Sequence, residues 1–257
     1  MRIDIITTFP GMFTDFMRES MMARALQQGI LSINVHDLRD FTDDPHRSVD
    51  DTPYGGGGGM ILMAEPIARA IETIRGEDDA TLIIPAARGE LFHQDTANSL
   101  TTHERLIFVC GHYTAIDERV FDYFKPLRLC IGDYVLTGGE LPTMVIVDAV
   151  ARRLPGFLGN DDSGREDSFV INGLGAPHYT RPQTWRGLEV PSVLISGHHA
   201  NVRAWRRQQA RLTTEQFRPE LLSTPGDGIS NATAANSESH ATGRSHDSAT
   251  RKENDHG

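Results

Sequence analysis

Three glycine-containing loops follow apolar runs that are typical of buried strands, and they could hold a flat ligand. They span residues 86–89, 111–116 and 132–139. In a parallel sheet, ligands bind at the carboxyl ends of the strands, where such loops meet the helices that follow. Glycine lets backbone N–H and C=O groups approach an adenine and a ribose without interference from a side chain. Each loop taken singly is more typical of an ordinary turn.

Two common nucleotide-binding motifs are absent from the sequence. Residues 7–11, at the end of the first apolar run, read TTFPG and do not form the GxGxxG turn of a dinucleotide-binding fold. The five glycines at 55–59 resemble a phosphate-binding loop, but Met and Ile follow them instead of Lys and Ser or Thr. We interpret this run as a hinge beside Asp50, Asp51 and Tyr54 that could close over a substrate. A phosphate-binding nucleotide enzyme is therefore a disfavoured reading.

Side chains that could bind a metal or attack a substrate give weak signals. His46 lies near Asp50 and Asp51, and His198 precedes His199, but neither group has the spacing of a zinc site. We interpret them as solvated loop residues and predict no metal ligands. A GxSxG turn is missing from the sequence, so nucleophilic catalysis by serine is unsupported.

The composition predicts a globular, cytoplasmic protein. The 257 residues are 39% hydrophobic and 23% charged, which suffices for one large domain or two small ones. No apolar run reaches the roughly 18 residues of a membrane span, and residues 1–9 lack the features of an export signal. Cys110 and Cys130 end apolar runs without metal-ligand or CxxC spacing, so we expect both to be buried and reduced.

The net charge of −10 argues against nucleic-acid binding, because phosphate contacts are made by Lys and Arg. One segment is an exception, and it falls on a predicted helix. It holds a single acid, Glu215, and five arginines: Arg203, Arg206, Arg207, Arg211 and Arg218. Composition alone fits a solvated helix face and a nucleic-acid-binding surface equally well.

Apolar periodicity predicts an α/β fold with a parallel sheet covered by helices on both faces. The predicted strands are 2–8, 31–36, 81–85, 106–110 and 127–131, and the predicted helices begin at 10, 65, 94, 117 and 141. Pro155 and Gly156 end the last of these helices. We therefore predict a first domain at 1–157, an interdomain linker at 158–176, a small helical domain at 177–224 and a disordered tail at 225–257, which is poor in core-forming residues.

Six strings in this chain resemble the bacterial tRNA (guanine-N1)-methyltransferases, which are SPOUT-type trefoil-knot methyltransferases. The order and spacing of the strings match that family from residue 1 to about 224. They are PYGGGGGM at 53–60, IDERV at 116–120, IGDYVLTGGELP at 131–142, REDSF at 165–169, PHYTRP at 177–182 and RPELL at 218–222.

The resemblance implies a parallel sheet with a deep trefoil knot, a helical C-terminal domain that binds tRNA, and a homodimer whose active sites are shared between subunits. It implies transfer of a methyl group from S-adenosyl-L-methionine to N1 of the guanine at tRNA position 37, beside the anticodon. It leaves open whether Mg²⁺ assists. A knotted tRNA-binding protein with weak or lost methyl transfer is the alternative.

The resemblance also assigns roles to residues. Asp167 is the candidate general base, and Arg152 is expected beside the guanine carbonyl. Both assignments suit the chemistry, because N1 must lose a proton and negative charge develops on the carbonyl oxygen. Without the resemblance, Asp167 would be read as a helix cap and Arg152 as a cation at a helix C-terminus. The implied cofactor contacts are Gly111, Ile131, Gly132, Asp133, Tyr134, Val135 and Leu136.

The chain departs from the family pattern at several positions beside these residues. His112, Tyr113, Thr114 and Ala115 stand where the family usually has Arg-Tyr-Glu-Gly, so the acid at position 114 is missing. A further two departures are Gly58 in place of Pro and Gly175 in place of Asp.

Overall fold

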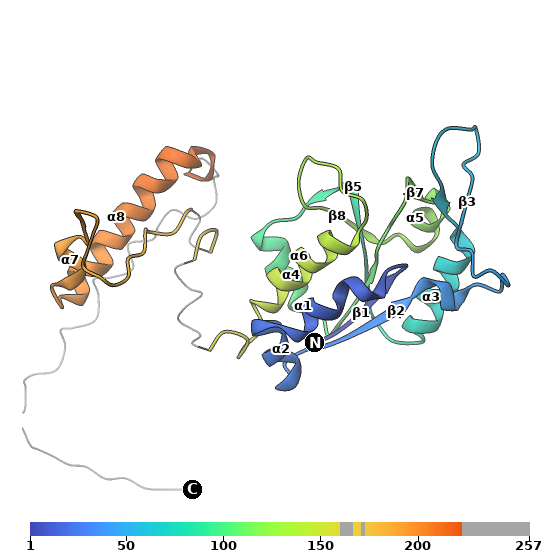
Figure 1. Cartoon of the computed structure of the whole chain (residues 1–257), viewed down its shortest axis with the longest axis horizontal. Coiled ribbons are helices and arrows are strands. Elements are labelled where there is room, and N and C mark those ends of the chain that lie inside the picture. Colours follow the sequence, from blue (N-terminus) through green and yellow to red (C-terminus); the bar gives the residue numbers. More distant parts are fainter. Residues whose placement is uncertain (160–166, 171–172, 223–257) are drawn as a thin grey trace, which may run out of the picture. The chain divides into compact units, whose positions relative to one another are not determined.

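The computed structural model describes residues 1–159, 167–170 and 173–222 of the chain (Figure 1). The predicted tail at 225–257 lies outside the described residues, and so do 160–166 and 171–172 of the predicted linker.

Strands and helices alternate through the first 151 residues, as predicted (Figure 1). The strands are β1 (Arg2–Thr7), β2 (Ser32–Asp37), β3 (Asp50–Asp51), β4 (Ile61–Leu62), β5 (Thr81–Leu91), β6 (Arg105–Val109), β7 (Ala115–Ile116) and β8 (Leu127–Cys130). The helices are η1 (Pro10–Phe13), α1 (Thr14–Arg18), α2 (Ser20–Gln27), η2 (Leu38–Phe41), α3 (Ala64–Arg75), α4 (Gln94–Leu100), α5 (Glu118–Phe124) and α6 (Glu140–Ala151).

The main sheet of the described residues is parallel, which confirms the prediction of an α/β fold with a parallel sheet. Its strand order is β2-β1-β6-β5-β8. β1 pairs with β2 on one side and, on the other, with β6, which lies about a hundred residues further along the chain than β1. The short strands β3, β4 and β7, which the sequence pattern did not predict, form a second sheet. The order of the main sheet brings the ends of β6 and β8, on either side of β5, toward one edge.

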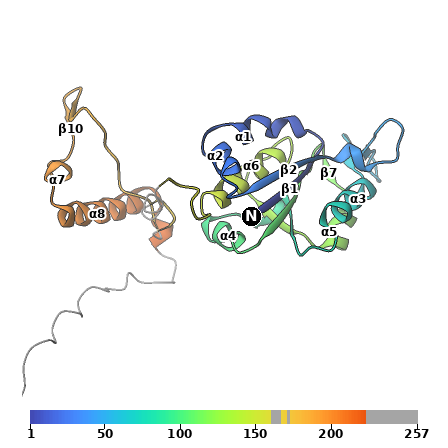
Figure 2. The same ribbon diagram turned by 90° about the horizontal axis from the view of Figure 1, so that it is seen from below.

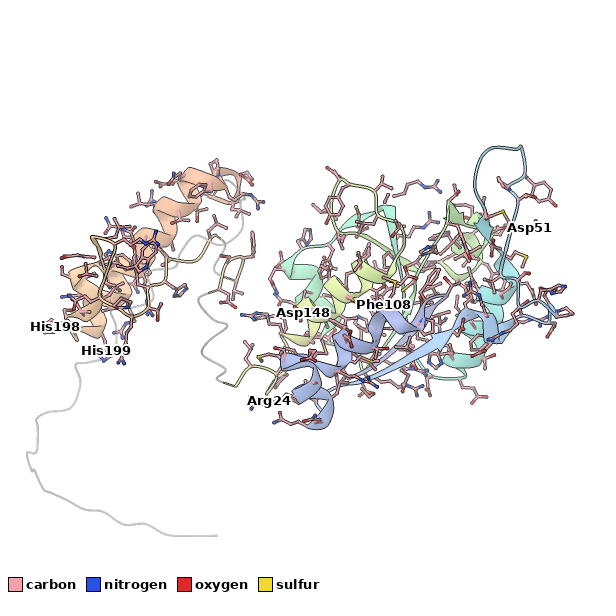
Figure 3. All side chains as sticks on the ribbon, viewed as in Figure 1. Arg24, Asp51, Phe108, Asp148, His198 and His199 are labelled. Atoms are coloured by element: carbon pink, nitrogen blue, oxygen red, sulfur yellow. The ribbon has the colours of Figure 1, made fainter. Side chains whose placement is uncertain are left out.

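The two faces of the sheet are buried in separate hydrophobic clusters. All five residues of β6 are buried. Because successive side chains of a strand point to opposite faces, Leu106 and Phe108 pack with residues of α2, α4 and α6, whereas Ile107 and Val109 pack with residues of α3 and α5. Figure 2 shows α1, α2 and α6 on one side of the sheet, and Figure 3 marks Phe108 in its core. Helices on both faces were predicted and are confirmed.

Two local predictions were wrong. The predicted continuous helix from Pro10 begins as the 3₁₀ turn η1, which runs directly into α1. It is then interrupted before α2, because Glu19 is extended and Ser20 has a left-handed φ of 55°. The predicted loop at 86–89 lies inside β5, which continues to Leu91. Both Pro85 and Glu90 pair with Leu129 of β8, so the intervening residues form a bulge in the strand rather than a loop.

The C-terminal segment contains a hairpin and helices: β9 (Thr184–Trp185), β10 (Leu188–Glu189), α7 (Ser192–Ile195), α8 (His199–Phe217) and η4 (Pro219–Leu222). Most of the arginine-rich segment lies on α8, which confirms the predicted helix. Residues 173 and 174 contact this helix: the buried Thr214 hydroxyl accepts a hydrogen bond from the Leu174 N–H at 2.9 Å. A Cβ on Gly173 would lie 2.9 Å from the same oxygen.

Candidate functional site

Two of the predicted ligand loops lie against each other at the carboxyl ends of β6 and β8. The Gly139 N–H donates a hydrogen bond of 2.6 Å to the Gly111 carbonyl, and His112 and Gly138 form an antiparallel bridge. A Cβ added at Gly139 would lie 2.8 Å from the Gly111 nitrogen and 2.9 Å from the Cys110 Cα, both backbone atoms. Glycine is needed at position 139 because the two backbones approach too closely for a side chain.

A cavity of about 290 Å³ is bounded by these loops and by the β5 bulge. Its lining combines exposed backbone with apolar side chains, the composition of sites for small molecules and cofactors. Asp133 is on the same loop but does not line the cavity. The other six predicted cofactor residues do: Gly111, Ile131, Gly132, Tyr134, Val135 and Leu136.

The loop that follows β8 is shaped by a glycine with an unusual backbone conformation. Gly132 has a φ of 150°, which L side chains rarely adopt. A Cβ there would lie 2.5 Å from the ring of Tyr134, whose hydroxyl donates to the Ile131 carbonyl at 3.2 Å. Tyr134 thus folds back over Gly132 and presents a largely exposed ring and backbone to the cavity.

A buried acid that sequence reasoning missed supports these loops. Glu140, the first residue of α6, is 1% exposed. Its carboxylate accepts a hydrogen bond of 2.8 Å from the Thr7 hydroxyl at the end of β1, and it lies 3.4 Å from Nδ1 of His112. An acid in the first turn of a helix complements the helix dipole. The sequence feature that could have indicated Glu140 is its position directly after Gly138 and Gly139.

His112, one of the departures from the family pattern, belongs to a row of rings. Its imidazole lies 4.5 Å from the Phe9 ring and 5.2 Å from the Tyr113 ring, measured between centroids. The orientation of the His112 ring is therefore fixed by its contact with Glu140 and by packing against the rings of Phe9 and Tyr113.

Thr114, where the family acid is missing, contacts the glycine run. Its N–H donates to the Met60 carbonyl at 3.0 Å, and its hydroxyl lies 3.5 Å from the Gly58 carbonyl. β4 and β7 pair next to this contact. The glycine run at 55–59 is therefore attached, through Met60, to the loop that lines the cavity. If this run acts as the predicted hinge, its movement would also displace the cavity loop.

The two predicted catalytic side chains contact each other but do not line this cavity. The Arg152 guanidinium donates to the Asp167 carboxylate at 2.6 Å. Both side chains are partly exposed, and Arg152 directly follows α6 as its C-cap. The structure thus joins a base candidate and a cation that lie 15 residues apart.

The described residues give little support for a cysteine nucleophile or a metal site. Cys110 is fully buried, and burial raises the pKa of its thiol far above the usual range, so it does not ionise to a nucleophile at neutral pH. Its sulfur lies 3.3 Å from the Thr143 hydroxyl. Cys130 is also a buried, free thiol. Figure 3 shows Asp51, and at the start of α8 His198 and His199. Among the described residues, no group of three or more His, Cys, Asp or Glu side chains is placed to hold a metal ion.

Comparison with known proteins identifies relatives over most of the chain. A family model described as tRNA (Guanine-1)-methyltransferase TrmD matches residues 1–224. A tRNA (guanine-N(1)-)-methyltransferase of Brevibacillus brevis is 48% identical over 222 residues, which cover 86% of this chain and 91% of that protein. Proteins of the same name from Moorella thermoacetica and Chloroflexus aggregans are 49% and 50% identical, over 90% and 88% of their lengths and 86% of this chain.

Proposed function

Because this chain belongs to the tRNA (guanine-1)-methyltransferase family, we propose that it methylates N1 of guanine 37 in tRNA, with S-adenosyl-L-methionine as the methyl donor. The observation that carries the proposal is the family match over residues 1–224, which includes both loops of the cavity. The relatives are named for methylation of guanine N1.

The cavity residues fit the proposed methyl donor. Gly111, Gly132 and Gly139 line the cavity without side chains, and backbone of this kind can hydrogen-bond an adenine edge. Apolar Ile131 and Leu136 supply contacts for the flat ring. When bound, the donor supplies an electrophilic methyl group on a sulfonium. The chain's own residues bind and orient that group and keep water away from it.

Asp167 and Arg152 are proposed to act on the guanine. The Asp167 carboxylate accepts the N1 proton as the new bond to carbon forms, so that the product leaves without an added proton. The Arg152 guanidinium donates hydrogen bonds to the carbonyl oxygen, where negative charge develops in the transition state. In the structure the Arg152 guanidinium donates a hydrogen bond of 2.6 Å to the Asp167 carboxylate. An entering guanine would replace this contact with contacts to its own N1–H and carbonyl.

A homodimer with shared active sites is part of the proposal. Arg152 and Asp167 do not line the cavity of their own chain, so a partner subunit that brings its pair to this cavity would complete the site. We also propose a trefoil knot, which membership of this family implies. The proposed organisation keeps a knotted domain at 1–157, a linker at 158–176 and a helical tRNA-binding domain at 177–224.

Two further features remain predictions. A cytoplasmic location follows from the proposed tRNA substrate. In the part of the chain that the structure describes, no helix is long and apolar enough to cross a bilayer. Dependence on Mg²⁺ is tested by methyl transfer with and without a chelator, after correction for the effect of Mg²⁺ on tRNA folding.

Methyl transfer can be tested directly with purified protein, labelled donor and tRNA transcripts, followed by mapping of the methylated base. We expect Asp167→Asn to lower the single-turnover rate about a hundredfold or more, the usual scale for loss of a general base. Asp148→Asn is the control, because it makes the same change at an exposed position of α6. Wild-type rate in Asp167→Asn would refute the assigned role. Binding of tRNA without methyl transfer by the wild type would favour the binding-protein alternative.

A further inference from the structure

A second cavity, of about 540 Å³, lies in the C-terminal segment and shares no lining residue with the first. Its apolar side is formed by Leu194 and Ile195 at the end of α7 and by Val202 of α8. Its polar side carries Arg181 and Arg206. The apolar side of such a cavity can contact a planar apolar group, and its two guanidinium groups can bind an anion.

The charge of this cavity selects an anionic ligand. Among the described residues that line it, none is acidic. The surrounding residues 173–222 contain three acids, of which Glu215 and Glu220 pair with Arg211 and Arg218. The same residues contain seven arginines: Arg181, Arg186, Arg203, Arg206, Arg207, Arg211 and Arg218. Against a net charge of −10 for the whole chain, this local excess of positive charge favours a phosphate-bearing partner.

Aromatic rings near these arginines select a planar ligand. Tyr179 lines the cavity and is 49% exposed, and its ring lies 6.3 Å from that of Trp205 on α8. The β9–β10 hairpin closes beside the cavity, where the Val190 N–H donates to the Gln183 carbonyl at 2.9 Å. Rings and guanidinium groups at one place are typical of proteins that bind unpaired nucleotides, whose bases stack on rings and whose phosphates pair with arginine.

We propose that this cavity binds one unpaired nucleotide of the RNA substrate, with its base against Tyr179 and its phosphate held by Arg181 and Arg206. The proposal rests on the proposed function, because that function supplies the RNA. A base within a duplex cannot enter a concave site without leaving its stack. The cavity therefore recognises a loop nucleotide and adds to affinity, and it takes no part in methyl transfer.

A matched pair of arginine substitutions separates this cavity from general attraction to RNA. Arg206→Gln and Arg207→Gln remove the same charge from adjacent positions of α8, but only Arg206 lines the cavity, and Arg207 is exposed. General electrostatic attraction predicts equal losses of affinity. The cavity predicts that Arg206→Gln weakens binding of a synthetic anticodon stem–loop at least about fivefold more than Arg207→Gln, and that Arg181→Gln behaves like Arg206→Gln.

A second measurement identifies the bound base. Tyr179→Leu and wild type are titrated with stem–loops that each lack one nucleobase, with Trp205 fluorescence in a Trp185→Phe background as the signal, since the chain has two tryptophans. We expect one abasic position to weaken binding to the wild type about fivefold or more and to leave binding to Tyr179→Leu unchanged. Unchanged melting temperature and donor affinity show that the variants are folded.

The failures of the two proposals are distinguishable. Equal effects of Arg206→Gln and Arg207→Gln in an enzyme that methylates tRNA, or an abasic penalty of the same size in wild type and Tyr179→Leu, would overturn the nucleotide cavity alone. Binding of free nucleoside monophosphate as tight as that of the stem–loop would overturn an RNA nucleotide as the occupant. Failure of the wild type to methylate any tRNA would overturn the proposed function.

Discussion

One methyl group added at Gly139 tests whether the contact between the two cavity loops is needed for donor binding. Gly139 has an ordinary φ of −82°, so alanine can adopt its backbone conformation. The new Cβ would nevertheless lie 2.8 Å from the Gly111 nitrogen and 2.9 Å from the Cys110 Cα. Carbon atoms pack at about 3.5–4.0 Å, so the loops would have to separate by most of an ångström.

The expected loss follows from this collision. Overpacking of a rigid site costs about 1–3 kcal/mol, and each kcal/mol lowers the melting temperature of a protein of this size by about 2–4 °C. We therefore expect Gly139→Ala to melt about 2–12 °C below wild type. Because the displaced Gly111 lines the cavity, donor affinity should also fall. Each 1.4 kcal/mol needed to bring the separated loops back together on binding lowers the affinity about tenfold.

Calorimetric titration with S-adenosyl-L-methionine and thermal melting measure both effects. Gly11→Ala is the matched control, because a Cβ at Gly11 has no neighbour within 4 Å. It should retain wild-type melting and affinity. If Gly139→Ala melts and binds the donor as Gly11→Ala does, then the loops separate freely and their contact does not shape the cavity.

Three other outcomes are expected. Burial acts to raise the pKa of Asp4, but hydrogen bonds from His36, Arg2 and Arg105 hold that pKa well below its usual range. The ionised Asp4 therefore stabilises the fold above about pH 4, and this stabilisation is lost as the pH falls below 4. Asp4→Asn should then cost about 3–5 kcal/mol of unfolding free energy at pH 7 in urea titrations and less at pH 3. Cys110 should resist alkylation at pH 8 until the protein is unfolded, since burial raises the pKa of its thiol; rapid labelling of folded protein, located by mass spectrometry, would contradict this. Gly132→Val should weaken donor binding in calorimetry because of its φ of 150° and the Tyr134 ring, and an unchanged dissociation constant would refute that expectation.

The parallel sheet was predictable because its central strands are buried on both faces. The run from Leu106 to Cys110 has no polar residue, and such a run between helical patterns indicates an interior parallel strand. The bulge in β5 was not predictable. Arg88, Gly89 and Glu90 resemble a turn in sequence, and pairing with β8 overrides that local signal.

The candidate site was predictable only in part, because its contacts join distant segments. Glycines after strands indicated two of the loops, but nothing local shows that the Gly139 N–H meets the Gly111 carbonyl. Glu140 has the sequence position of an ordinary acid at a helix start, and its partner Thr7 lies 133 residues away. The resemblance to a family supplied the proposed roles of Arg152 and Asp167, since composition and spacing alone favoured a cap and a dipole partner.

The pairing of β1 with β6 imposes a waiting time on the nascent chain. After β1 and β2 have left the ribosome, the other edge of β1 has no partner until Arg105–Val109 emerges about 70 residues later. At about 5–20 residues per second, that interval is about 4 to 14 s. During it, the apolar residues Ile3, Ile5 and Ile6 stand on an open strand edge, the kind of surface through which chains aggregate. Slowed translation between residues 37 and 105 should therefore lower the yield of native protein more than the same delay after Cys130, by which point all five strands of the main sheet have been made.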